Sequence, residues 1–126
     1  MQVDRFTSKL QDALETAQSM ALGRDHQFIE PTHLMLALLQ QQAGTVKPLL
    51  AQSGVTVAAY EEALDSQLSR FAQVEDGDGN IHVSQDLARL LNQSDKLAQK
   101  RQDQYISSEL VVLAVVADKG KAGETL

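Results

Sequence analysis

The first seventy residues place apolar side chains at the three- and four-residue spacing of a helix face. Thr7 is a suitable N-cap, and the apolar positions that follow it are separated by four, three and four residues. These positions are Leu10, Leu14, Ala17 and Ala21. The pattern predicts a helix that begins after Thr7, and we expect Gly23 to end it in a left-handed conformation.

Three further helices are predicted before residue 72. Pro31 fits the first turn of the second helix, where its missing N–H is not needed. This helix is apolar on most sides and should therefore lie at the centre of the fold. Its large apolar residues are Leu34, Met35, Leu36, Leu38 and Leu39. Thr45 can cap a short third helix that stops at Gly54, and Thr56 can cap a fourth that extends to Phe71.

The segment VEDGDGNIHV, residues 74–83, interrupts the helical pattern. Two glycines among Asp and Asn residues are typical of turns. We therefore interpret residues 74–83 as a linker, with a short extended piece at residues 81–83.

The pattern of the first helices returns after the linker with an offset of 77 residues. Ser84 can cap a helix as Thr7 does, and the residues from 84 to 116 match those from 7 to 39 without a gap at eight identical positions. The identical pairs are Leu10/Leu87, Leu14/Leu91, Ala21/Ala98, Arg24/Arg101, Gln27/Gln104, Ile29/Ile106, Leu36/Leu113 and Ala37/Ala114. Phe28 and Tyr105 preserve a ring at another matched position. We infer an internal repeat of one helical unit.

The repeat predicts an all-α fold in which two copies of a four-helix unit pack about a pseudo-two-fold axis. Residues 1–126 form a single domain, with repeat one at 4–73, the linker at 74–83 and an incomplete repeat two at 84–126. Leu126 corresponds to Leu49, so the second copy is truncated at its C-terminus, and a complete domain would have about 148 residues. We expect a binding groove at the seam between the two copies.

Composition supports one helical core. The chain has 126 residues, of which 43% are hydrophobic, enough for one core and too few for two. It has no Trp and few aromatic residues, so aliphatic side chains must pack between the helices. The absence of Cys excludes disulfides and thiol nucleophiles and suits a reducing compartment. The longest apolar run, residues 110–117, is far shorter than the roughly 20 residues of a membrane span, so we expect a cytoplasmic protein that contacts no membrane.

Charge and motifs exclude several functions. The net charge of −6 disfavours nucleic acid as a partner, and acidic residues flank the one basic cluster, Lys96, Lys100 and Arg101. The segment DGDGN begins like a calcium loop, but Ile81 and Leu87 stand where Gly and Glu are required. The three His residues lack metal-ligand spacing, and no phosphate-binding loop, GxSxG elbow or SxxK pair occurs. We therefore expect no catalytic, metal-binding or cofactor-binding residues.

Three stretches of the sequence are similar to a known family. These are DRFTSKLQDAL, AQSMALGRDHQFIEPTHLMLALL and SQDLARLLNQSDKLAQKRQDQYISSEL. They resemble the N-terminal domain of the Clp (Hsp100) unfoldases, which consists of two helical repeats, and the third stretch is typical of the disaggregase branch. The resemblance implies a non-catalytic module that captures apolar segments of unfolded or aggregated polypeptides. It would pass them to the remainder of an AAA+ hexamer, whose ATP- and Mg²⁺-binding modules are absent from this chain.

The resemblance also implies a set of binding residues in a groove at the repeat junction. They are Thr7, Ser84, Leu91, Asp103, Glu109 and Leu110. A structural role competes in each case. The first two are N-caps, and the two leucines belong to apolar stripes. Asp103 follows a helix end, and Glu109 falls in the first turn of another helix, where a carboxylate interacts favourably with the helix dipole. Two other functions stay open, namely docking of an adaptor protein, as in protease-linked relatives, and, more weakly, nucleic-acid binding.

Overall fold

The computed structural model describes residues 5–73 and 81–118. These residues form six helices and two strands of two residues each, which confirms the predicted helical class. The elements are α1 (Ser8–Gly23), β1 (Phe28–Ile29), α2 (Pro31–Gln40), α3 (Val46–Gln52), α4 (Val57–Arg70), β2 (His82–Val83), α5 (Gln85–Lys100) and α6 (Ser108–Ala117).

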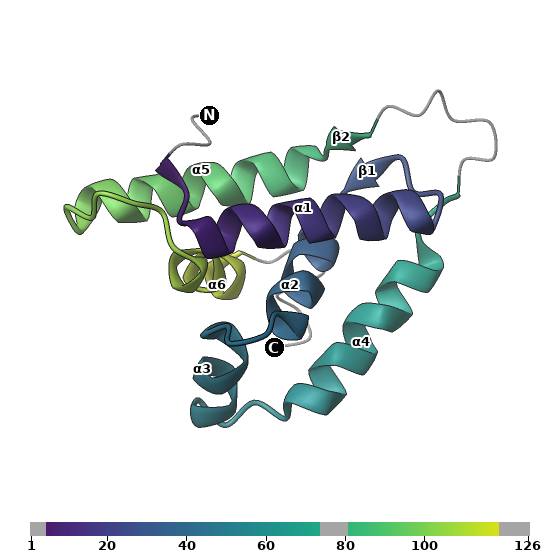
Figure 1. Cartoon of the computed structure of the whole chain (residues 1–126), viewed down its shortest axis with the longest axis horizontal. Helices are drawn as coiled ribbons and strands as arrows, with labels where there is room; N and C mark the ends of the chain where they lie inside the picture. Colours follow the sequence, from purple (N-terminus) through teal and green to yellow (C-terminus); the bar gives the residue numbers. More distant parts are fainter. Residues whose placement is uncertain (1–4, 74–80, 119–126) are drawn as a thin grey trace.

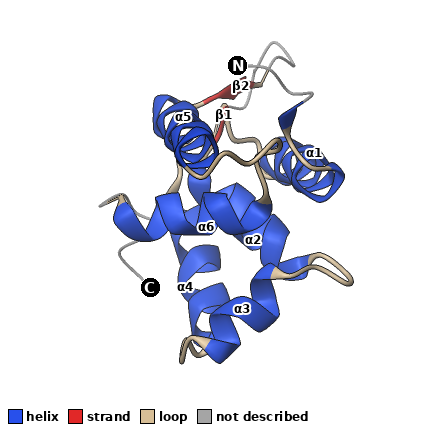
Figure 2. Cartoon of the chain, turned by 90° about the vertical axis from the view of Figure 1, so that its left-hand side faces the viewer, coloured by secondary structure: helices blue, strands red, loops and turns tan. Residues whose placement is uncertain are grey.

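The helices lie in three layers around α2. Helices α1 and α5 run in opposite directions along one side of the molecule (Figure 1). The end-on view shows α2 and α6 beneath them, and α3 and α4 on the far side (Figure 2). Helix α2 packs against all five other helices. Every residue from Thr32 to Leu39 is buried, so the prediction of a central helix is confirmed.

The two repeats adopt the same local structure at the predicted offset. Helix α5 begins and ends 77 residues after α1, and α6 stands in the same relation to α2. All four buried positions of α1 have buried counterparts in α5, namely Leu10/Leu87, Ala13/Leu90, Ala17/Ser94 and Ala21/Ala98, and Leu91 is a fifth buried position of α5 whose counterpart Leu14 is half-buried. Equivalent sequence positions therefore face the core in both copies.

A residue in the left-handed conformation follows both α1 and α5. In α1 it is not Gly23, which the sequence suggested. Gly23 is the last helical residue of α1, and the positive φ of 58° belongs to Asp25. Its counterpart Gln102 has φ of 61°. The next N–H in each copy, that of His26 or Asp103, then bonds a carbonyl five residues back, at 2.9 and 2.8 Å. This bond sets the position of the reversal, and Asp is one of the few non-glycine residues that visit this region readily.

The seam between the repeats is held by reciprocal backbone hydrogen bonds. The Thr7 N–H donates to the Ile106 carbonyl at 3.0 Å, and the Ser84 N–H donates to the Ile29 carbonyl at 3.1 Å. Thr7 corresponds to Ser84 and Ile29 to Ile106, so each bond is the image of the other. Strand β2, within the predicted extended piece, pairs in parallel with β1. Residues 74–80 of the predicted linker lie outside the described residues.

The two copies differ on the outer face of α2 and α6. Leu36 and Leu39 are only 4% and 2% exposed, on a helix against which α4 packs. Their counterparts on α6, Leu113 and Val116, are 49% and 59% exposed. The counterpart of α4 would fall beyond residue 126, so the expectation of a longer, complete domain stays a prediction.

The four predicted N-caps differ in their chemistry. The Thr7 hydroxyl accepts the Leu10 N–H at 3.2 Å, and the Ser84 hydroxyl accepts the Leu87 N–H at 3.0 Å. Thr45 and Thr56 occupy the cap positions of α3 and α4, yet neither side chain makes a capping hydrogen bond. The prediction that these two threonines cap their helices was therefore right in position and wrong in bonding.

Replacement of each cap by Ala tests this difference. Thr7→Ala and Ser84→Ala should each lower the free energy of unfolding by about 1 kcal/mol, because each leaves a helix N–H without its acceptor. Thr56→Ala is the matched control and should cost less than half as much. Urea titration followed by circular dichroism measures all three. An equal loss in the control would contradict the assignment.

Candidate functional site

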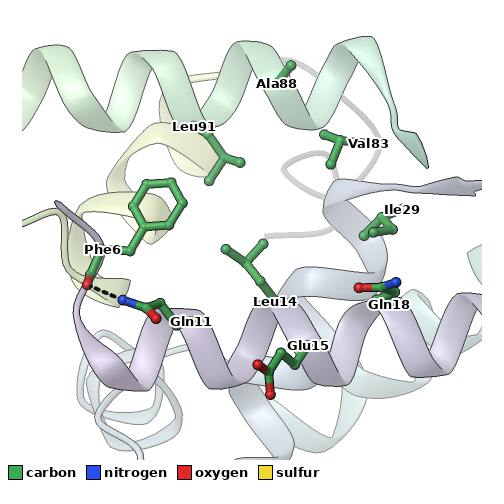
Figure 3. A pocket seen from close by; sticks show the side chains of 9 residues that line it. All are labelled: Phe6, Gln11, Leu14, Glu15, Gln18, Ile29, Val83, Ala88 and Leu91. Carbon is green, nitrogen blue, oxygen red and sulfur yellow. Dashed lines mark hydrogen bonds between the residues drawn. The ribbon is translucent and has the colours of Figure 1, made fainter. Parts of the chain in front are cut away.

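An apolar groove of about 420 Å³ lies between α1 and α5 (Figure 3). Its lining residues are Phe6, Gln11, Leu14, Glu15, Gln18, Ile29, Val83, Ala88 and Leu91. The volume falls in the range of about 300–1,000 Å³ that is usual for ligand sites. The groove occupies the seam between the repeats, where the sequence predicted one.

The floor of the groove is built from matched residues of the two repeats. Leu14 of α1 and Leu91 of α5 extend into it from opposite sides (Figure 3). Phe6 and Val83, which directly precede the two N-caps, stand at its two ends. Each pair is related by the offset of 77 residues, so the pseudo-two-fold axis passes through the floor. Ile29 of β1 adds a further apolar side chain at the Val83 end.

The polar side chains that line the groove all belong to α1. Gln11, Glu15 and Gln18 form this wall, whereas α5 contributes Ala88 to the opposite one. The Gln11 amide donates to the Phe6 carbonyl at 3.0 Å. An apolar floor with one polar wall can bury aliphatic or aromatic side chains with little regard to their identity, because apolar burial is non-directional. The wall can add hydrogen bonds to a polar backbone.

Three of the six predicted binding residues lie in or beside the groove. Leu91 lines it and is 5% exposed. Thr7 and Ser84 follow Phe6 and Val83 in the chain, and both serve as helix caps. Ser84 also lines a separate, smaller hollow together with Phe28 and Glu30.

The other three predicted residues do not line this groove. Asp103 forms an ion pair with Arg101 at 3.3 Å. Glu109 accepts a hydrogen bond from the Thr45 hydroxyl, which joins the two repeats and lowers the pKa of the Glu109 carboxyl. Leu110 is 1% exposed and belongs to the core. Their part in binding stays a prediction.

The sequence contained a signal for the groove residues that were missed. Leu14 is the repeat counterpart of Leu91, so the prediction of Leu91 as a binding residue implies Leu14 as a second one. Phe6 and Val83 form a second matched pair, each one residue before an N-cap. Applying the two-fold relation to the candidate list would have found Leu14, whereas Phe6 and Val83 are found only by taking the residue that precedes each N-cap.

A buried histidine pair lies apart from the groove, where α1, α2 and α4 meet. The Glu30 N–H bonds His33 Nδ1 at 2.8 Å, and His33 Nε2 lies 2.9 Å from His26 Nδ1. The His26 ring also hydrogen-bonds the backbone of Leu68, and both rings stack edge-on or tilted against Phe71. Because the Glu30 N–H needs a lone pair on His33 Nδ1, His33 must carry its proton on Nε2 and donate it to His26. His33 is therefore a buried packing residue whose ring nitrogens are both hydrogen-bonded.

Both histidines are held neutral. Burial lowers the pKa of His33 to about 4, and repulsion from the Arg24 charge, and from His26 once that ring is protonated, adds to the effect. Burial also lowers the pKa of His26, with Arg24 adding to the effect. A second proton on His33 would sit on Nδ1, where it would face the Glu30 N–H, and the two donors would repel each other. The pair is therefore structural at neutral pH.

Comparison with known proteins identifies the family of the chain. The model of the Clp repeat (R) N-terminal domain matches residues 5–126. The chain belongs to this family. The chaperone protein ClpB of Pseudomonas putida is 50% identical over 126 residues, which is 100% of this chain and 15% of that protein. ClpB of Vibrio cholerae matches with the same identity and the same coverage.

A solved member of the family has the same fold. The N-terminal domain of the ClpV1 ATPase from E. coli EAEC superimposes with a TM-score of 0.82 at 26% identity, over 91% of this chain and 69% of that one. The helical repeats of this chain are therefore those of a Clp N-domain. The chain spans about 15% of the length of its ClpB relatives. Within residues 5–73 and 81–118, no helix is both long and apolar enough to cross a membrane, and no cluster of His, Asp or Glu is suited to a metal ion.

The histidine pair makes stability depend on pH. The pKa of His33 is lower in the folded protein than the value of about 6.5 in an unfolded chain, so protons bind the unfolded state first as pH falls. Between pH 7 and pH 5 the free energy of unfolding should therefore fall by about 2 kcal/mol from His33. His33→Leu, which copies Leu110 of repeat two, should remove this part of the slope.

Urea titrations at the two pH values measure the effect, as a difference between parent and variant. His82→Gln is the matched control, because it removes an exposed imidazole and leaves the pair intact. Equal pH dependence in the parent protein and in His33→Leu would contradict the assignment.

Proposed function

We propose that this domain captures exposed apolar segments of unfolded or aggregated proteins in the groove between α1 and α5. The observation that carries the proposal is the facing pair Leu14 and Leu91 in a groove whose floor is apolar. Such a floor selects its ligand by hydrophobicity and not by sequence, which suits a module that must recognise many misfolded proteins. The name of the ClpB relatives, chaperone protein, supports the same class of ligand.

Capture by this groove should be weak and reversible. Burying about 300 Å² of apolar surface contributes roughly 7 kcal/mol. Association costs at least about 4 kcal/mol in lost translational and rotational freedom. The remainder corresponds to dissociation constants around the millimolar range, improved by hydrogen bonds to the polar wall. A domain that loads segments onto another machine must also release them.

We propose that the captured segment is passed to other domains of a longer parent protein. The ClpB relatives are several times the length of this chain, and we propose that a hexameric AAA+ motor in the parent protein receives the segment and uses ATP to pull it. The domain itself would then act without catalysis and without a cofactor. A cytoplasmic location stays part of this proposal.

Docking of an adaptor protein is the alternative function. It would use an outer helix face, whereas capture of unfolded segments would use the groove. Titration of the ¹⁵N-labelled domain with a permanently unfolded protein, reduced and carboxymethylated α-lactalbumin, separates the two. Shifts gathered at Leu14 and Leu91 support capture, and shifts confined to the exposed face of α6 at Leu113 and Val116 support docking.

A charge in the groove provides the mutational test. Leu14→Glu should weaken binding of the same unfolded protein at least tenfold, because a buried carboxylate opposes apolar contact. Leu22→Glu is the matched control: Leu22 lies on the same helix, is 46% exposed and does not line the groove. Fluorescence anisotropy of the labelled unfolded protein measures both. Equal weakening by the two variants, or none by Leu14→Glu, would overturn the proposal.

A further inference from the structure

The groove between α1 and α5 has matched surfaces in both directions along its length. Four of its apolar residues form two pairs related by the pseudo-two-fold axis, Phe6 with Val83 and Leu14 with Leu91, and Ile29 adds to the Val83 end. Helices α1 and α5 run in opposite directions beside it (Figure 1). Figure 3 shows the leucines at the middle and the second pair at the ends. A half-turn about the axis therefore exchanges the two ends and leaves an apolar floor of the same kind.

At each end of the groove, one backbone N–H group that could pair with a bound peptide already makes a hydrogen bond within the domain. Strand-like recognition needs unpaired N–H and C=O groups, whose order distinguishes one chain direction from the other. The N–H groups of Thr7 and Ser84 instead donate to the Ile106 and Ile29 carbonyls across the seam. The symmetry of these bonds repeats the symmetry of the floor.

The polar wall does not impose a direction either. Along α1 it presents an amide, a carboxylate and an amide, from Gln11, Glu15 and Gln18. This order of chemical groups is the same when read from either end, and amides both donate and accept. Whichever way an extended segment runs, one of its lateral sides faces this wall and the other faces Ala88 on α5. A uniformly apolar segment therefore meets similar contacts in both directions.

We infer that the groove binds apolar segments in both chain directions with similar affinity. The inference rests on the proposed function and adds to it the orientation of the ligand. For a captured protein this doubles the number of ways in which a given apolar stretch can dock. It also means that a segment can be taken up at an internal position regardless of which chain end lies nearer.

Paramagnetic labelling tests the inference. The probe is a nonpalindromic apolar peptide of eight residues, which spans about 26 Å when extended. It carries a nitroxide on a cysteine at its N-terminus in one sample and at its C-terminus in the other. We expect each peptide to broaden the ¹⁵N-domain amides at both ends, near Phe6 and near Val83, and the ratio of broadening to agree between the two samples within about threefold.

Each other outcome has a distinct meaning. Broadening of one end by the N-terminal label and of the opposite end by the C-terminal label would overturn two-way binding and leave the proposed capture function intact. Absence of any chemical-shift change with the unlabelled peptide would remove the capture function and the inference with it. Shifts that lie outside the groove would have the same consequence.

A variant with an imposed direction serves as the control. Val83 is 47% exposed, so Val83→Lys adds a positive charge at one end with little effect on packing. A peptide with a single Asp near its C-terminus should then place that end beside position 83. The C-terminal nitroxide should broaden the Val83 end more than threefold over the Phe6 end. This result would show that the measurement resolves direction, so that equal broadening in the parent domain reports two-way binding.

Discussion

The reciprocal pairing of the two repeats across their seam is the interaction on which the rest of the structure depends. Thr7 bonds Ile106, and Ser84 bonds Ile29, at almost equal distances. The same two residues cap α1 and α5 with their side chains, so the start of each helix is tied both to its own first turn and to the other repeat. One seam hydrogen bond lies near the start of α1 and its counterpart lies near the start of α5. Because the two helices are antiparallel, these bonds fix the spacing between them at both ends, and the apolar groove occupies that space.

The repeats are alike at the seam and differ away from it. His26 and His33 of repeat one correspond to Asp103 and Leu110 of repeat two. In repeat one, the two imidazoles hydrogen-bond each other and both rings pack against Phe71. In repeat two, Asp103 pairs with a neighbouring arginine and Leu110 enters the core. Selection for a symmetrical groove is compatible with such divergence, since neither pair lines it.

The acidic character of the chain agrees with a ligand chosen by hydrophobicity. Arg5 pairs with Asp95, Arg24 with Asp65 and Arg89 with Asp118, so several of the 11 Lys and Arg side chains are already paired within the domain. Glu15 is the charged side chain among the groove residues, on a wall that otherwise presents amides and apolar groups. Electrostatic contacts of such solvent-facing groups are weak at physiological salt, so burial of apolar surface would dominate the affinity of the groove for the proposed ligand.

Local pattern in the sequence was sufficient to predict the helices, the repeat offset, the central place of α2 and the existence of a groove at the seam. The helices and the central place of α2 follow from the spacing of apolar residues and from cap chemistry, which act within a few residues of the chain. The groove was expected from the repeat, which is visible as a match at an offset of 77 residues. The composition of the groove required the tertiary structure. Leu91 and Leu110 carry the same side chain in similar apolar stripes, yet one lines the groove and the other enters the core. That difference depends on how α1 and α5 are placed across the seam. The backbone hydrogen bonds there join Thr7 to Ile106 and Ser84 to Ile29, which are 99 and 55 positions apart in the chain, so local periodicity carries no trace of them.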